Sequence, residues 1–184
     1  TVAGDHYNLV GFQTRMKWGA QKETLRLIPG LEQAEFARFG SIHRNTYVQA
    51  PKVLDATLAV KGVKHLWIAG QLSGVEGYLE SAAGGLAAAR FLDESLRTGA
   101  ARPLPRETML GALLHYLAHA TLPDFGPTNA MIGLLPELPE GAVDVRAAKR
   151  ANGRAGVKSA KGAAHRARAL AALEAHLALE GLPA

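Results

Sequence analysis

The sequence of 184 residues contains no cysteine. This absence excludes disulfide bonds, thiolate nucleophiles and zinc sites that use cysteine ligands. No apolar run in the sequence approaches the ~20 residues that a transmembrane helix needs. The first residues also lack the basic and apolar regions of a signal peptide. The lack of cysteine does not fix the compartment, but nothing points to secretion, and we expect a cytoplasmic protein that has no membrane partner.

Acidic residues are scarce in the last part of the chain. Residues 1–144 hold 13 Lys/Arg and 14 Asp/Glu, which gives a net charge of −1. Residues 145–184 hold 8 Lys/Arg and 2 Asp/Glu, which gives a net charge of +6. This asymmetry favours an anionic partner for the C-terminal segment, with RNA or DNA as the candidates. Because the same segment has no aromatic residues, we expect contacts with backbone phosphates rather than stacking on bases.

A subset of these basic residues is expected to make the phosphate contacts. Helical spacing would place the first four of them on roughly one side of a helix. The candidates are Arg146, Lys149, Arg150, Arg154, Lys158 and Lys161. The alternative is a solvated basic helix without a fixed partner. The leucines that follow, from Leu170 to Leu179, indicate that the end of this helix docks on the rest of the protein.

Hydrophobic periodicity predicts both strands and helices. The expected strands are Tyr7–Gln13, Glu35–Val48 and His65–Ala69, and Pro51 should end the second of them. The expected helices are Trp18–Ile28, Tyr78–Leu96, Thr108–His119 and Arg146–Leu179. Three glycines, Gly153, Gly156 and Gly162, weaken the prediction for the first half of the last helix. The fold class predicted from this pattern is α/β.

One stretch, HLWIAGQLSGVEGYLESAAGG at residues 65–85, combines an apolar strand, a Gly-rich turn and a helix. Such a turn is a general anion site, since the first amides of a helix are unpaired and its dipole favours negative charge. Gly70, Gly74 and Gly77 would let a ligand touch the backbone, and the helix glycines would allow close approach. The alternative is a tight connection in which small residues serve packing. The spacing matches neither GxGxxG nor a phosphate-binding P-loop.

The run AGQLSGVEGYLESAAGGLAAARFL resembles the C-terminal flavin motif of the GidA-like flavoproteins that modify tRNA. Three further runs are similar to the folate- and FAD-dependent tRNA (uracil-5-)-methyltransferases within that group. They are YNLVGFQTRMKWGAQKETLRLIPGLEQAEFARFGSIHRNTYVQAPKVLD, PRETMLGALLHYL and FGPTNAMIGLLP. The resemblance extends from about Tyr7 to about Leu138.

The resemblance implies an architecture for the chain. Residues 1–50 would belong to an inserted α+β domain on the folate side, and residues 51–140 to the C-terminal part of a Rossmann-like FAD-binding domain. Residues 141–184 would form a basic helical segment. The family's GxGxxG motif and its catalytic cysteines lie upstream of these runs and have no counterpart in this sequence. We therefore expect a C-terminal fragment or a split subunit that is inactive without the N-terminal half.

The resemblance also implies an activity, in which C5 of a T-loop uridine in tRNA receives a methyl group. Methylenetetrahydrofolate would donate the methylene group, and reduced FAD would pass it to the uridine. NAD(P)H would regenerate the reduced flavin. No catalytic side chain is expected in this chain. The expected FAD-binding residues are Gly70, Gln71, Gly74, Val75, Glu76, Gly77, Tyr78, Glu80 and Ser81.

The resemblance makes His43 a candidate cap over the folate, and Arg44 a candidate partner for the folate carboxylates or an RNA phosphate. Glu76 or Glu80 could pair with the pterin edge. Each has a plainer alternative: a hydrogen-bonded strand histidine, a surface ion pair and helix capping respectively.

Two other functions stay open. The chain could be a non-enzymatic tRNA-binding remnant, or an enzyme of the GidA type that modifies the wobble uridine of the anticodon. A metal centre is not expected. His115 and His119 have the spacing of a ligand pair on a helix, but the HExxH pattern is absent.

Overall fold

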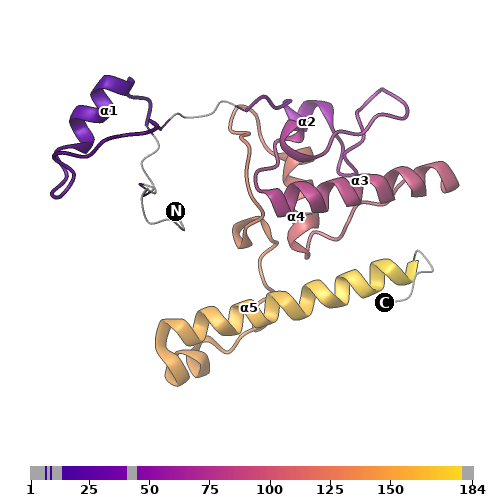
Figure 1. The fold of residues 1–184 in the computed structure, drawn as a ribbon. Helices are drawn as coiled ribbons and strands as arrows, with labels where there is room; N and C mark the ends of the chain where they lie inside the picture. The colour runs from indigo at the N-terminus through magenta and orange to yellow at the C-terminus, as the bar shows by residue number, and fades with distance from the viewer. Residues whose placement is uncertain (1–6, 8, 10–13, 41–44, 180–184) are drawn as a thin grey trace. The chain divides into compact units, whose positions relative to one another are not determined.

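The computed structural model describes Tyr7, Leu9 and residues 14–40 and 45–179 of the chain. The chain divides into two compact units, Thr1–Asn45 and Thr46–Ala184. Figure 1 labels the helices of both units. Among the described residues, none of the helices combines the length and the apolar character needed to cross a membrane.

The first unit is built around helix α1, Trp18–Leu25. Its Gln21 side chain is only 2% exposed. The Gln21 amide donates to the carbonyl oxygens of Met16 at 2.8 Å and Gly40 at 2.9 Å, and its oxygen accepts from the Gly40 N–H at 3.0 Å. A buried amide needs such partners, since an unsatisfied one costs free energy. Gln21 therefore fixes the helix against residue 40.

The expected strand Glu35–Val48 is wrong for the part of it that the structure describes. Residues 35–40 and 45–48 form no strand, and residues 41–44 lie outside the described residues. Pro51 lies in the first turn of helix α2, Ala50–Val53, where the lack of an N–H costs no intrahelical hydrogen bond. Of the expected strand Tyr7–Gln13, the structure describes only Tyr7 and Leu9.

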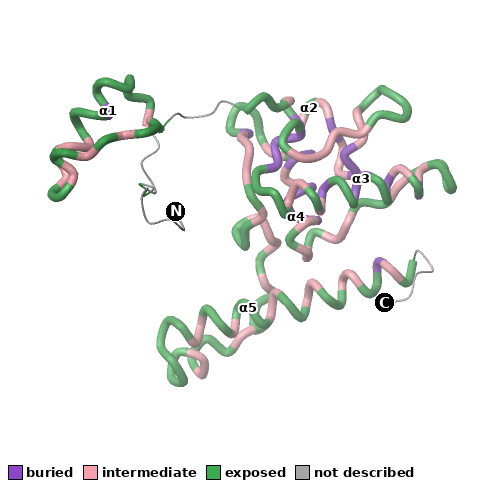
Figure 2. Tube along the Cα trace, viewed as in Figure 1, coloured by how far each residue is buried: buried purple, intermediate pink, exposed green. Residues whose placement is uncertain are grey.

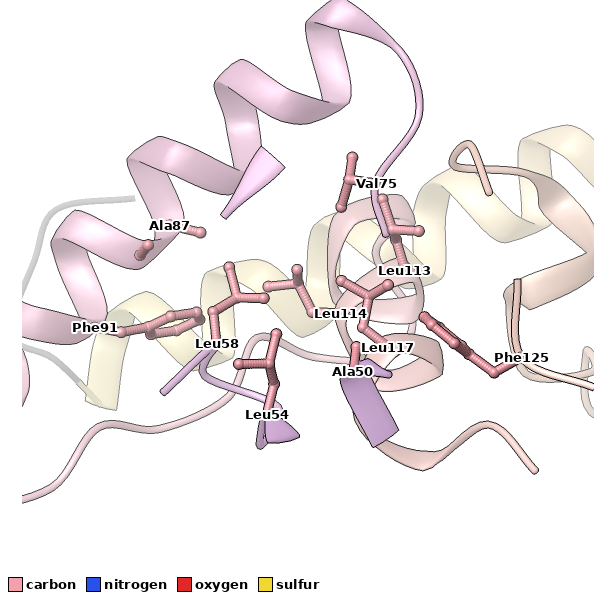
Figure 3. Packing of buried hydrophobic residues seen from close by; sticks show 11 residues of the cluster. Ala50, Leu54, Leu58, Val75, Ala87, Phe91, Leu113, Leu114, Leu117 and Phe125 are labelled. Carbon is pink, nitrogen blue, oxygen red and sulfur yellow. The ribbon is translucent and has the colours of Figure 1, made fainter. Parts of the chain in front are cut away.

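The core of the second unit lies between helices α3, Tyr78–Thr98, and α4, Met109–His119. Helix α4 contributes three leucines that are at most 1% exposed. Figure 3 shows how they pack with apolar residues of neighbouring segments. The cluster includes Leu54, Leu58, Val75, Ala87, Phe91, Leu113, Leu114, Leu117 and Phe125. Each buried leucine or phenylalanine contributes about 1.5–3 kcal/mol, so this cluster is the main source of stability.

The start of helix α4 is fixed by two local features. The Thr108 hydroxyl oxygen accepts a hydrogen bond from the Gly111 N–H at 3.0 Å. A Cβ on Gly111 would collide with the carbonyl oxygen of Pro105, so only glycine fits there. The structure confirms the predicted helices at residues 78–96 and 108–119 to within two residues at each end.

The expected strand His65–Ala69 is wrong. His65 has a φ of 60°, so the backbone turns where an extended run should begin. The described residues contain only isolated β-bridges: Leu54 with Val60, Ala59 with Trp67, and Val75 with Thr128. A strand requires a neighbouring strand along its length, and residues 65–69 meet one only at Trp67. The helices of the α/β prediction are present, whereas the described residues contain no strand.

Helix α5, Val145–Leu179, is interrupted at Asn152 (φ −154°, ψ 40°) and Gly153 (φ 53°, ψ −139°). The short helix η2, Ile132–Leu134, precedes it. Most of α5 is exposed or half-buried (Figure 2), and His176 is its buried residue.

The second part of α5 is held on the unit by two arginines. The Arg168 guanidinium donates to the carbonyl oxygens of Glu137 at 2.7 Å and Pro136 at 2.5 Å. The Arg102 guanidinium donates to the carbonyl oxygen of Leu179 at 3.1 Å. Docking of this helix was expected from its leucines: Leu173 and Leu177 are half-buried, whereas Leu170 and Leu179 are exposed. Hydrogen bonds to backbone carbonyls add to the attachment.

Candidate functional site

The Gly-rich turn between residues 70 and 77 has an unusual backbone that glycines permit. Helix η1, Gly70–Ser73, is closed by Gly74 in the left-handed region, and Gly77 precedes α3. The φ angles of Gly70, Gly74 and Gly77 are 70°, 93° and 93°. Side chains rarely adopt such angles, so all three glycines are explained by the path of the chain itself.

Packing gives Gly74 a second reason to be glycine. A Cβ at this position would lie 2.9 Å from Cζ of Phe125 and 3.6 Å from Cδ2 of Leu117. Both neighbours belong to the buried core. The sequence left open whether a ligand or packing requires the turn glycines, and for Gly74 the structure gives packing as the reason. At Gly70, by contrast, the nearest side-chain atom would be 3.7 Å away, on Ser81.

A second segment lies beside the turn. The Glu76 N–H donates to the carbonyl oxygen of Thr128 at 2.9 Å, and the Thr128 N–H donates to that of Gly74 at 3.0 Å. This pairing brings the Asn129 amide nitrogen to 2.9 Å from the place that a Cβ of Gly77 would occupy. Sequence reasoning gave Asn129 no role. Its only signal was the run FGPTNAMIGLLP, which carries no titratable group or familiar spacing.

The N-terminus of α3 is open at its first turn. Gly77, the residue before the helix, makes no side-chain hydrogen bond to the helix start. The amides of Tyr78, Leu79 and Glu80 precede the first intrahelical donor and point out of the helix. The side chains of Tyr78 and Leu79 are 99% and 81% exposed. Within the part of the chain that the structure describes, no acceptor is recorded for these N–H groups, and they lie on the surface at the positive end of a 21-residue helix.

Other predicted ligand residues lie around this helix start. Gln71 and Glu76 are exposed, and Ser81 is half-buried beside Gly70. The Glu80 carboxylate folds back against the Cα of Gly77. Val75 is 1% exposed, so its side chain belongs to the core and only its backbone faces the turn.

The glycines of α3 differ from those of the turn. No described atom outside the helix's local backbone lies within 4 Å of a Cβ built on Gly84 or Gly85. Leu86, which follows them, is 68% exposed. The close approach that these glycines would allow is therefore not made within the part of the chain that the structure describes.

The two folate candidates His43 and Arg44 lie outside the described residues. The residues that follow them reach the turn. The Val48 N–H donates to the carbonyl oxygen of Leu72 at 2.9 Å. The Tyr47 ring meets Phe125 edge-on, with the ring centroids 6.1 Å apart.

The six basic candidates of α5 are all exposed. The expectation that four of them share one side of a single helix is wrong, because the helix is interrupted between Arg150 and Arg154. A continuous helical phase is lost at Asn152 and Gly153, so the spacing rule does not apply across them.

The histidine pair of α4 is compact. The His115 and His119 rings stack with centroids 4.1 Å apart, and Nδ1 of His119 lies 3.0 Å from the carbonyl oxygen of His115. Burial lowers the pKa of His115, and the nearby positive charges of Arg106 and His119 lower it further. The residues that the structure describes hold no group of three or more candidate metal ligands.

The class of protein follows from a comparison with protein families. The family model described as Glucose inhibited division protein A matches residues 1–99. This range is more than half of the chain and includes the whole Gly-rich turn. The chain belongs to this family.

Individual relatives carry a more specific name. A Staphylococcus carnosus protein named methylenetetrahydrofolate–tRNA-(uracil-5-)-methyltransferase TrmFO is 51% identical over 138 residues, which cover 74% of this chain and 32% of that protein. The Moorella thermoacetica protein of the same name is 54% identical over 137 residues, 74% of this chain and 31% of the relative. The Desulfitobacterium hafniense protein of the same name is 46% identical over 180 residues, which cover 98% of this chain and 38% of that protein. The chain thus spans about a third of the length of the curated relatives it matches.

Proposed function

We propose that the chain is the C-terminal portion of a flavoenzyme that methylates C5 of the T-loop uridine in tRNA. The single observation that carries this proposal is about 50% identity to proteins named for this reaction. The proposed methylene donor is methylenetetrahydrofolate, and the proposed reductant is NAD(P)H. The enzyme acts in the cytoplasm and needs no membrane.

The proposed FAD site is the open start of α3. An electron-rich ring placed there would meet the first-turn amides and the positive end of the helix dipole. A Cβ on Gly70 would make only ordinary van der Waals contact with Ser81, at 3.7 Å, so no side chain of its own stands between its backbone and a flat ring. The residues present therefore fit the flavin. When bound, FAD supplies the redox chemistry that converts a methylene group into a methyl group.

This chain's own residues would bind and orient the ligands. The exposed amide of Gln71 and the carboxylate of Glu76 can form hydrogen bonds with polar ring edges. The Asn129 amide and the Glu80 carboxylate, both beside Gly77, would add a donor and an acceptor. Gly74 contributes indirectly by keeping the turn packed on Phe125. His43 and Arg44 stay candidates for the folate side.

The proposed domain assignment follows the same family. Residues 1–50 belong to an inserted α+β domain and residues 51–140 to the FAD-binding domain, with a basic helical segment at 141–184. The division of the chain after Asn45 supports a boundary near the first of these limits. The N-terminal half of the enzyme, with the GxGxxG motif and the catalytic cysteines, is the proposed partner. Residues 65–69 would gain their missing strand neighbours from it.

Two competing functions make different predictions. A non-enzymatic tRNA-binding remnant would bind tRNA without flavin. An enzyme of the wobble type would leave an aminomethyl derivative on the anticodon uridine instead of 5-methyluridine. The names of the relatives favour the uracil-5 reaction.

The test joins this chain to the part of the Staphylococcus carnosus relative that it does not match, and records the visible absorption of the purified chimera. We expect a flavin spectrum, and a reduced flavin content in Gln71→Ala and Glu76→Gln. Both side chains are exposed, so these losses would reflect ligand contact rather than misfolding. Glu140→Gln, also exposed, is the control that should keep its flavin. A folded but colourless chimera that binds tRNA would favour the remnant.

A further inference from the structure

The first part of α5 folds back on the second part as a helical hairpin (Figure 1). A Cβ on Gly156 would collide with the carbonyl oxygen of Ala148 and lie 3.2 Å from Cβ of Asn152. In a continuous helix, residues eight positions apart are separated by about 12 Å along the axis. The contact between Gly156 and Ala148 therefore requires the reversal at Asn152 and Gly153. Gly153 has a φ of 53°, which favours glycine.

The hairpin, residues 145–161, begins and ends at defined points. At its start, Oδ1 of Asp144 accepts a hydrogen bond from the Ala147 N–H at 2.8 Å. Beyond its end, Arg168 is bonded to the carbonyl oxygens of Glu137 and Pro136. The hairpin is thus continuous with a helix that is attached to the second unit, and its backbone follows a defined path.

The hairpin carries positive charge and no acidic residue of its own. From Val145 to Leu173 the sequence contains no Asp or Glu. Among the described residues, no recorded ion pair or side-chain hydrogen bond involves its six basic side chains, all of which are exposed. These residues are Arg146, Lys149, Arg150, Arg154, Lys158 and Lys161. A concentrated field of one sign favours a polyanion over a single small anion.

The apolar content of the hairpin distinguishes between classes of polyanion. The only large apolar residues of the hairpin are Val145 and Val157. A helix that lies on a lipid surface needs an apolar face with leucine or aromatic residues. Protein interfaces rely on aromatic anchors, which the hairpin also lacks. Basic side chains on an alanine-rich framework suit the phosphates of a nucleic acid, which require charge and no apolar contact.

We propose that residues 145–161 form an arm that binds the phosphate backbone of structured RNA. The arm supplies affinity and orientation, whereas the choice of uridine belongs to the site around the flavin. This inference rests on the proposed function, because tRNA is the RNA on which that function acts. It goes further in assigning tRNA affinity to a hairpin whose geometry depends on Gly153 and Gly156.

The first experiment measures binding of an unmodified tRNA transcript to the full chain as salt is varied. If all six side chains contact phosphates, the slope of log K against log salt should be about −4 to −5. The double variant Lys158→Gln/Lys161→Gln should reduce the magnitude of this slope by about 1.5. Lys52→Gln/Lys64→Gln removes the same charge from exposed positions outside α5 and should leave binding nearly unchanged. Equal losses in both pairs would overturn the proposal, because binding would then follow net charge alone.

A second experiment tests the geometry without changing charge. Gly156→Leu forces the two helices of the hairpin apart, whereas Gly162→Leu places the same side chain where nothing lies within 4 Å. We expect Gly156→Leu to weaken tRNA binding about tenfold and Gly162→Leu less than twofold. If Gly156→Leu binds tRNA as tightly as the wild type, the hairpin geometry is not needed for binding and the proposal is overturned in favour of a flexible basic tail.

Two controls separate this inference from the proposed function. Vesicles rich in phosphatidylglycerol should bind the chain more weakly than tRNA does, and stronger binding to vesicles would overturn the proposal. In the chimera, the Gly156→Leu variant should keep its flavin while its KM for tRNA rises. If the unmodified chimera binds tRNA through the hairpin but forms no 5-methyluridine, the proposed function is contradicted, whereas the inference that residues 145–161 bind RNA is supported.

Discussion

The Gly-rich turn and helix α5 both contain several glycines, yet the two regions use them differently. In the turn, Gly74 lies against the buried ring of Phe125, so glycine there serves the core. In α5, Gly156 lies against Ala148 on an exposed hairpin, and Gly162 has open space around it. A glycine-rich stretch therefore does not by itself indicate a ligand. The neighbours of each glycine decide whether stability or a surface shape depends on it.

The largest effect is expected where glycine meets the core. Gly74→Ala should lower the free energy of unfolding by about 2–4 kcal/mol, because it combines overpacking with a strained positive φ. Gly162→Ala should leave stability unchanged or raise it by up to about 1 kcal/mol, as expected inside a helix. Denaturant unfolding of the two variants checks the contrast. Equal stabilities would mean that the turn is not packed as described.

A second effect concerns the attachment of α5 to the rest of the unit. The Glu94 carboxylate, 8% exposed, accepts hydrogen bonds from the Arg102 N–H and Nε, both at 2.9 Å. Glu94→Gln should cost about 1.5–3 kcal/mol, the range for hydrogen bonds to a charged group. Asp93→Asn, which alters an exposed ion pair with Arg97, should cost less than about 1 kcal/mol. Comparable losses in thermal or denaturant unfolding would contradict this account of the attachment.

The same pair gives a pH dependence. Burial raises the pKa of the Glu94 carboxyl, but the backbone and side-chain hydrogen bonds from Arg102 outweigh it, so the pKa lies below its ordinary value. A carboxyl with a lowered folded pKa contributes stability above its unfolded pKa of about 4.3. That contribution is lost as pH falls through the folded pKa. The stability difference between wild type and Glu94→Gln should therefore shrink below about pH 4, and a constant difference would argue against the ion pair.

The smallest effects concern the two helix starts. Thr108→Ala removes the hydroxyl that caps α4 in the core and should lower global stability by about 1 kcal/mol. Asp144→Ala removes the cap of α5 at an exposed position. It should speed amide exchange in the first turn of α5 with little change in global stability. Hydrogen exchange combined with denaturant unfolding measures both, and a global loss in Asp144→Ala would show that the hairpin belongs to the core.

The helices were predictable because their signals are local. Apolar spacing placed both α3 and α4. The absence of a strand at residues 65–69 was not predictable from such signals, because strands depend on neighbours far away in the sequence. For α5, the glycines warned of an interruption. They did not reveal that Gly156 would meet Ala148, since that contact depends on the exact backbone angles at Gly153.

The candidate site was predictable only in part. The turn and its open helix start could be located from the glycines and the following helix. Asn129 was missed because nothing in the sequence shows that the chain returns beside Gly77 after α4. The packing role of Gly74 was also hidden, because it depends on Phe125 from the same distant segment. Such pairings depend on tertiary structure, which periodicity does not record.

The most direct test of the central claim is nucleoside analysis of tRNA treated with the chimera, methylenetetrahydrofolate and NAD(P)H. The account predicts 5-methyluridine in the T-loop and no change at the wobble uridine. It also predicts less product from Gln71→Ala than from the Glu140→Gln control. A flavin-containing chimera that modifies the wobble uridine, or forms no 5-methyluridine while binding tRNA, would contradict the account.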